Sequence, residues 1–519
     1  MTRRHLLGAA ALVAAAGLAL AGCTGTSSGG ETPADRTLTV AVGTPPVSLD
    51  TLKAATGVPG TWFETPAYAA VLTRDADGQI QAGLAEKWGY VGDGNTEFEF
   101  TLRDGLTFAD GTPLTATEVA DSLTYFTATT TGPTRAYFAP MTFTAVDDLT
   151  VHITSAVPNP IIPDMLTVGL LGGAPISPAG IADESARAGD TFGAGQYVLD
   201  TAQTVSGDHY VYVPNENYYD QNAITYSQIE IKVIPNPQQQ VQALKTGQVD
   251  AIVGDPSIGG TVTGGGFQEI HQPATVYNFY LMDRDGKVVP ALANEKVRQA
   301  LNFAVDRESI AQAALGDYGT ATDQTAIDAG PASGYDAALE SVYGYDPEKA
   351  KQLLAEAGFA DGFTIPATYL GFSPTDTTIA QAVASQLAEV GVTLDLKSEP
   401  DFGSWVNDLV SGNYAATLLT GDGSQMYINA QFAFTPNAVM NQFGVSDPAL
   451  NDAFQALATA TPDQIGAAAQ AVNTVIVDEA LALPIAANQS IIIFNGDKVT
   501  PYYLGSTGEL APIETWPLK

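Results

Sequence analysis

The feature that most constrains this chain is a strand–helix–strand order that occurs once in each half. Residues 226–254 read YSQIEIKVIPNPQQQVQALKTGQVDAIVG. This is a strand-like run, Asn236 as helix cap with Pro237 in the first helical position, a helix that stops at Gly247, and a second strand. Residues 363–398 repeat the order with FTIPATYL, an amphipathic helix and VTLDLKS. We therefore predict an α/β fold with two lobes, largely parallel sheets covered by helices on both faces, and a ligand cleft between the lobes.

Local signals predict further elements. Thr115 and Glu118 form a capping box that opens one helix, and Asp346 followed by Pro347 opens another. The strings DADGQI (75–80) and DRDGKVV (283–289) place Asp-Gly pairs between strand-like runs, which predicts two hairpin turns. Neither string continues as a calcium-binding EF-hand loop does.

The amino-terminal segment predicts export. Arg3 and Arg4 precede an uncharged run over residues 6–21, which is too short to span a bilayer and is typical of a signal peptide. Leu20-Ala21-Gly22-Cys23 resembles the lipobox of bacterial lipoproteins, so Cys23 is the expected lipidation site. Residues 24–35 are rich in Thr, Ser and Gly and should form a flexible tether. The TRRHLL string leaves both twin-arginine and Sec export open.

Charge and motifs narrow the function classes. The chain has 57 acidic against 21 basic side chains and a net charge of −36, which disfavours nucleic acid and anionic lipid as partners. The sequence contains no HExxH, GxSxG or GxxxxGK string, and His152, His209 and His271 stand in separate segments. We therefore predict a protein that is not an enzyme and has no cofactor or metal site. A secreted glycosidase remains open as a remote alternative, because many acid pairs are available.

Several motifs together resemble family 5 extracytoplasmic solute-binding proteins, the peptide, oligosaccharide and nickel receptors of ABC importers. Leu84, Ala85 and Trp88 match the family's LAxxW pattern. The pattern LRxGxxFxDGxPxTAxDVxxS is matched by Leu102, Arg103, Gly105, Phe108, Asp110, Gly111, Pro113, Thr115, Ala116 and Val119. Further matches are LKTGQVDAI, EKVRQALNFAVDRESIA and YDPEKAKQLLAEAGF, in the family's order.

The resemblance implies a two-lobe fold of the periplasmic-binding-protein type (type II), with an extra subdomain in lobe one. Lobe one would comprise residues 36–278 and 484–519, and lobe two residues 279–483, with hinge strands near TVYNFYLMD and LPIAANQSIII. It also implies a monomeric, lipid-anchored receptor on the extracytoplasmic face of the cell membrane. This receptor would capture short peptides between its lobes and deliver them to an ABC permease.

The same resemblance suggests the ligand-binding residues. Asp422 takes the place of the family's aspartate that holds a peptide amino terminus, although Leu419 stands where a tryptophan is expected. Trp62 and Trp405 are candidate cleft walls, and Tyr427 follows the Asp422 loop. The helical spacing in FGSWVNDL favours a core position for Trp405. Because the tryptophan is missing, an oligosaccharide or another polyhydroxylated solute is the alternative ligand.

Overall fold

A computed structural model describes residues 36–54, 60–130, 134–170, 172–254, 256–262, 264–371, 373–505 and 509–519. The predicted leader, the lipidation site at Cys23 and the tether lie outside these residues. Of the helices in the described ranges, none is both long and apolar enough to cross a membrane.

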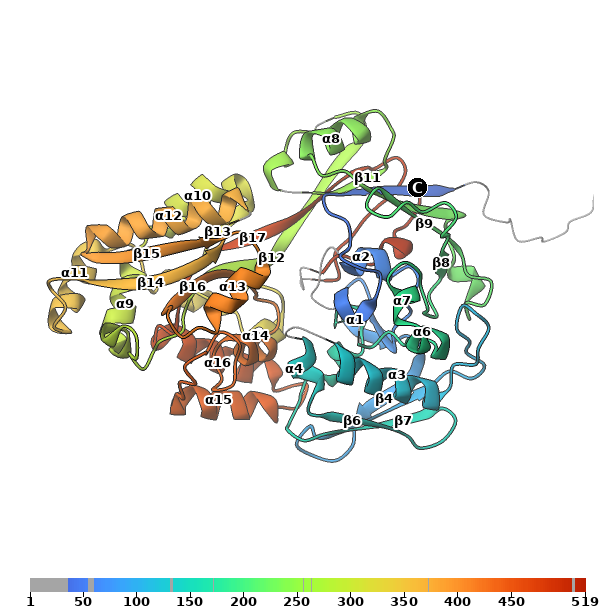
Figure 1. Cartoon of the computed structure of the whole chain (residues 1–519), viewed down its shortest axis with the longest axis horizontal. Coiled ribbons are helices and arrows are strands. Elements are labelled where there is room, and N and C mark those ends of the chain that lie inside the picture. The colour runs from blue at the N-terminus through green and yellow to red at the C-terminus, as the bar shows by residue number, and fades with distance from the viewer. Residues whose placement is uncertain are drawn as a thin grey trace, which may run out of the picture.

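Two bodies stand side by side and are joined by two long strands, β12 (Phe267–Leu281) and β17 (Ala482–Asn495) (Figure 1). We call the body that contains β1 to β11 and the segment after β17 the first lobe, and the body from α9 to α16 the second lobe. Within the described residues, eleven strands form one sheet that runs through both. The two long strands pair antiparallel along nearly their whole length. The exact lobe division after residues 278 and 483 remains a prediction.

The strand–helix–strand unit predicted in the first half is confirmed. β10 (Gln228–Val233) leads through α8 (Pro237–Lys245) to β11 (Ala251–Gly254), and the Asn236 side chain accepts a hydrogen bond from the Gln239 N–H as the helix cap. Both strands pair parallel with β1 (Thr37–Val42), which lies between them. The amino-terminal strand thus becomes the centre of this part of the sheet.

The second unit is also confirmed. β14 (Phe363–Leu370), α12 (Pro374–Glu389) and β15 (Val392–Glu399) follow one another, and the two strands pair parallel. Buried Ile379, Val383 and Leu387 form the face that α12 turns to the sheet. In Figure 1, α10 (Arg307–Leu315) lies on the same side of the sheet as α12. The buried hydrophobic residues of α9 (Glu295–Phe303) belong to the same hydrophobic cluster as those of α10 and α12, whereas those of α13 (Phe402–Leu409) belong to a different cluster.

Two sequence predictions are wrong. The large sheet is mixed, because β12 pairs antiparallel with both β17 and β16 (Ala416–Asp422), and β11 pairs antiparallel with β17. The DRDGKVV string does not turn a hairpin either. The Asp283 carboxylate instead accepts hydrogen bonds from the N–H groups of Lys287, Val288 and Val289 and folds a compact loop. The DADGQI hairpin is confirmed, between β2 (Leu72–Arg74) and β3 (Ile80–Ala82).

A separate antiparallel sheet adds a subdomain to the first lobe. Its strands, in spatial order, are β4 (Ala85–Tyr90), β5 (Glu97–Leu102), β7 (Thr150–Ser155) and β6 (Met141–Ala145). Helix α3 (Ala116–Thr129) begins with the predicted capping box and buries Val119, Leu123 and Phe126. These elements account for the dense motif region of residues 84–123.

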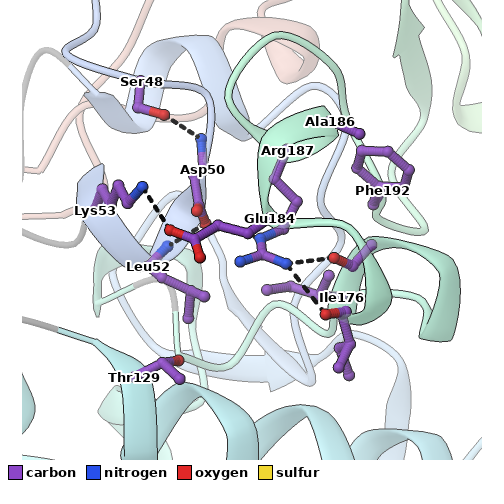
Figure 2. A network of polar contacts seen from close by, with 12 residues as sticks. Ser48, Asp50, Leu52, Lys53, Thr129, Ile176, Glu184, Ala186, Arg187 and Phe192 are labelled. Atoms are coloured by element: carbon purple, nitrogen blue, oxygen red, sulfur yellow. Dashed lines mark hydrogen bonds and ion pairs between the residues drawn. The ribbon is translucent and has the colours of Figure 1, made fainter.

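A buried ion pair joins Asp50, directly before α1 (Thr51–Ala54), to Arg187 at the end of the short helix α7 (Glu184–Arg187) of the same lobe (Figure 2). Arg187 Nε lies 3.1 Å from Asp50 Oδ1, and both side chains are 1% exposed. Arg187 also donates to the Gly180 carbonyl and, over 3.1 Å, to the Tyr125 hydroxyl. Because a buried charge without a partner is very costly, the pair makes the two segments depend on each other.

Candidate functional site

The main cavity lies between the two lobes and has a volume of about 830 Å³. Residues of the first lobe, the second lobe and the two connecting strands all line it. Its polar and aromatic lining includes Trp62, Arg74, Asp77, Asp164, Asp422, Ser424, Gln425, Tyr427, Asn488, Gln489, Ser490 and Glu509. A volume of this size accommodates a small organic ligand.

The connecting strands form one wall of the cavity. The pairing of β12 with β17 shifts register between Pro273 and Thr275, so Ala274 has no partner in the ladder. Ala274 and Thr275 line the cavity, as do Asn488 and Gln489 on the facing strand. Proline cannot donate a backbone hydrogen bond, so a bulge is where it fits inside a sheet. The irregularity therefore places backbone and amide groups at the ligand cavity.

Asp422 is the last paired residue of β16, opposite Thr275 of β12. Its Oδ1 accepts hydrogen bonds from the backbone N–H of Ser424 (2.7 Å) and from the Ser424 hydroxyl (2.6 Å). Asp422 is exposed to solvent through the cavity, and protein atoms of the cavity wall lie around its carboxylate. This desolvation raises the pKa of Asp422 above its usual value, while the Ser424 hydrogen bonds act in the opposite direction. The group is a hydrogen-bond acceptor fixed at the end of a strand.

A second polar cluster lies on the first lobe, around Arg74. The guanidinium donates from Nη2 to the Asp164 carboxylate and from Nη1 to the Gly78 carbonyl, 2.8 Å away. Its Nε lies 3.7 Å from Glu509 Oε2. Arg74 comes from β2, Asp164 from the short helix α5 (Ile162–Met165), and Glu509 from the chain's last segment. Three distant parts of the sequence thus meet at one edge of the cavity.

The aromatic candidates separate into two groups. Trp62, in α2 (Gly60–Glu64), and Tyr427, in α14 (Met426–Ala433), line the cavity. The Tyr427 ring stacks on Phe454 at 5.1 Å between centroids. Trp405 is buried in α13 and donates from Nε1 to the Thr417 hydroxyl at 3.0 Å, and it is not among the lining residues.

Leu419 also stands apart from the cavity lining. It pairs with Asn278 within the β12–β16 ladder and packs against the hydrophobic core that includes Tyr427. Position 419, where the resemblance leads us to expect a tryptophan, is therefore a packing position in this chain. A leucine there leaves the ladder intact.

The two lobes touch at several places around the cavity. The Gln425 side chain donates to Asp164 Oδ1 over 3.1 Å, and the Tyr427 hydroxyl donates to the Pro158 carbonyl over 2.9 Å. Farther out, the Asn95 side-chain amide donates to the carbonyls of Ala458 (3.0 Å) and Ala460 (2.9 Å). These carbonyls lie at the end of α15 (Pro448–Ala458), where helical carbonyls lack partners within the helix. The first lobe therefore caps a helix of the second.

Sequence reasoning did not identify Arg74, Asp164 or Glu509 as site residues. A single arginine between a strand-like run and the DADGQI turn was the available signal, because a cation in such an acidic chain is uncommon. Within the residues that the structure describes, no group of three His, Cys, Asp or Glu side chains could hold a metal ion.

Comparison with known sequences gives one family and several relatives. The model of bacterial extracellular solute-binding proteins, family 5 Middle, matches residues 79–440. The dipeptide-binding protein of Lactococcus lactis subsp. cremoris is 27% identical over 89% of this chain and 89% of its own length. The nickel-binding periplasmic protein of Escherichia coli is 26% identical over 69% of this chain and 70% of its own.

Solved structures share the fold at low sequence identity. The PBP AgaA of A. tumefacien R10, in complex with agropinic acid, superposes with a TM-score of 0.77 at 23% identity, covering 93% of this chain and 99% of AgaA. The unliganded open form of the periplasmic murein tripeptide-binding protein MppA gives a TM-score of 0.74 at 22% identity, covering 93% and 98%. The predicted two-lobe binding-protein fold is thus confirmed.

Proposed function

Because the chain belongs to the family 5 bacterial extracellular solute-binding proteins, which are receptors rather than enzymes, we propose that it captures short peptides between its lobes. It then delivers them to an ABC permease and performs no catalysis itself. The observation that carries this proposal is the inter-lobe cavity, in which a fixed carboxylate, Asp422, stands at the end of β16 beside the irregular stretch of β12.

The cavity supplies the groups that an extended peptide needs. A charge-assisted hydrogen bond from the peptide's ammonium to Asp422 would hold the amino terminus. Ala274, unpaired at the bulge, and the polar side chains of Asn488 and Gln489 provide backbone and amide partners along the connecting strands. The dipeptide-binding relative, aligned over most of both chains, supports this ligand class.

Calorimetric titration of the Asp422→Ala variant with a short peptide tests the proposal. We expect binding to weaken by ~1.5–3 kcal/mol, the range for a lost hydrogen bond to a charged group. The matched control is Asp361→Ala, an exposed aspartate of the second lobe outside the cavity, which should bind like the wild type. Equal affinity in all three proteins would exclude Asp422 as the amine-binding group.

We further propose that Cys23 carries a lipid that holds the receptor at the extracytoplasmic face of the membrane, where it works as a monomer. The lipobox-like Leu20-Ala21-Gly22-Cys23 string supports this location. Membrane fractionation and mass spectrometry of the Cys23→Ser variant test it. A wild-type chain that carries no lipid would contradict the anchor without affecting the assignment of the cavity.

An oligosaccharide is the second candidate ligand, and Trp62 is the observation that favours it. The indole lies at the cavity wall and is partly exposed, so it could stack on a sugar ring. If sugars are the ligand, Trp62→Ala should abolish binding of an oligosaccharide while Asp422→Ala leaves it unchanged. Thermal-shift screens of peptide and oligosaccharide pools separate the two candidates.

A further inference from the structure

The ionisable groups that line the inter-lobe cavity are strongly unbalanced. Among its described lining residues, Arg74 is the one cation, and the acids are Asp77, Asp164, Asp422 and Glu509. One positive and four negative groups give a formal charge of −3 when all are ionised. The walls have low dielectric constant and focus this field into the cavity, where it acts on any ligand that enters.

The single cation is already committed to protein acceptors. Arg74 Nη1 donates to the Gly78 carbonyl, Nη2 to the Asp164 carboxylate, and Nε faces Glu509 at 3.7 Å. Nη1 and Nη2 therefore each hydrogen-bond an oxygen of the first lobe, while Nε is buried without a hydrogen-bond partner and lies within ion-pair distance of Glu509. A ligand carboxylate that approached Arg74 would enter beside the negative charges of Asp164 and Glu509.

The four carboxylates of the cavity together carry more negative charge than the single positive charge of Arg74 can neutralise. Burial and the charges of Asp164 and Asp422 raise the pKa of Glu509, and the opposing effect of Arg74 does not cancel them. The three carboxylates thus act on one another electrostatically although they come from different lobes. One ammonium at Asp422 would leave the repulsion around Glu509 and Asp164 in place.

Resting on the proposed function, we infer that the cleft selects peptides that carry a net positive charge and rejects anionic solutes. The amino-terminal ammonium pairs with Asp422, and a lysine or arginine side chain of the peptide supplies the second cation, directed at Glu509 and Asp164. This cation relieves the repulsion among the three carboxylates, and it does not require Arg74 to release its partners. The ligand class is therefore a short basic peptide.

Calorimetric titration of the purified full-length chain with three tripeptides of equal length tests the inference: Ala-Lys-Ala, Ala-Ala-Ala and Ala-Glu-Ala. We expect affinity to fall in that order, by roughly tenfold or more at each step, the scale of one charge-assisted hydrogen bond. If Ala-Glu-Ala binds as tightly as Ala-Lys-Ala, the charge selection is refuted while peptide binding stands. If none of the three binds, the proposed function is refuted and this inference with it.

Substitution of Glu509 identifies which carboxylate carries the selection. Glu509→Gln should reduce the preference for Ala-Lys-Ala over Ala-Ala-Ala several-fold. The matched control Glu348→Gln removes an exposed carboxylate of α11 (Pro347–Glu356), far from the cavity lining, and should keep the full preference. A full preference in Glu509→Gln would overturn the assignment to Glu509. The wild-type comparison of the three peptides does not depend on whether this variant folds.

Discussion

The contact of Asn95 with the end of α15 should hold the lobes together, and replacing it gives a measurable shift. Asn95 is 8% exposed, and its amide donates to the carbonyls of Ala458 and Ala460. Its backbone has φ of 55°, a left-handed conformation that glycine adopts without strain. Asn95→Gly therefore removes the two inter-lobe hydrogen bonds that the Asn95 side chain donates, while the turn between β4 and β5 keeps its shape.

The expected magnitude follows from the two bonds that are lost. Each contributes a net ~0.5–1.5 kcal/mol, so the closed arrangement should lose about 1–3 kcal/mol relative to the open one. This corresponds to a fall of roughly 5- to 150-fold in the ratio of closed to open molecules. Asn95 is not among the cavity-lining residues, so any loss of ligand affinity must come from this change in population.

Small-angle X-ray scattering of the protein without peptide measures the shift directly, as a larger radius of gyration in Asn95→Gly than in the wild type. Calorimetry should show weaker peptide binding, and saturating peptide should restore the wild-type scattering. The control Asn413→Gly alters an exposed asparagine of the second lobe. If both scattering and affinity in Asn95→Gly equal those of the control, the amide does not hold the lobes and the reasoning is refuted.

Three further predictions concern stability, each read as the free energy of unfolding in urea. Asp50→Ala leaves Arg187 buried without its partner and should cost ~3–5 kcal/mol, and most of this loss should be recovered when Arg187→Met is added. Burial raises the pKa of Glu514 from 4.5 to about 7. The contribution of Glu514 to the free energy of unfolding is therefore fully present below pH 4.5, and it is lost as the pH rises to about 7. Glu514→Gln should therefore match the wild type near pH 4 and exceed it above pH 7 by roughly 3 kcal/mol, and a pH-independent difference would contradict this origin. Asn236→Ala removes the cap of α8 and should cost about 1 kcal/mol, whereas Asn236→Asp should cost much less.

Local features of the fold were predictable from the sequence because neighbouring residues determine them. The caps at Thr115, Asn236 and Asp346 and the helical spacing around Trp405 all depend on positions within one or two turns. The sheet was less predictable, since β12 and β17 are separated by some two hundred residues and pair antiparallel. The amino-acid composition of a strand does not determine which distant strand it pairs with.

Some residues of the candidate site were likewise predictable from the sequence, and others were not. Asp422 could be proposed because it takes the place of an aspartate in the family that the sequence resembles, and it does line the cavity. The cluster of Arg74, Asp164 and Glu509 could not, because its members are brought together by folding. Asp164 lies 90 positions from Arg74, and Glu509 follows near the chain's end. No spacing rule links such residues.

The continuous sheet through β12 and β17 sets how the receptor can release its cargo. The two lobes are joined by adjacent strands that are hydrogen-bonded to each other. The lobes can therefore open through a change in the twist of this strand pair. A permease that turns the lobes apart can empty the cavity while the ladder between the strands stays intact. One of the two register shifts between these strands lies beside Pro273, at the cavity wall, where the ladder is locally disrupted. A change of twist in this strand pair would therefore move residues that line the cavity.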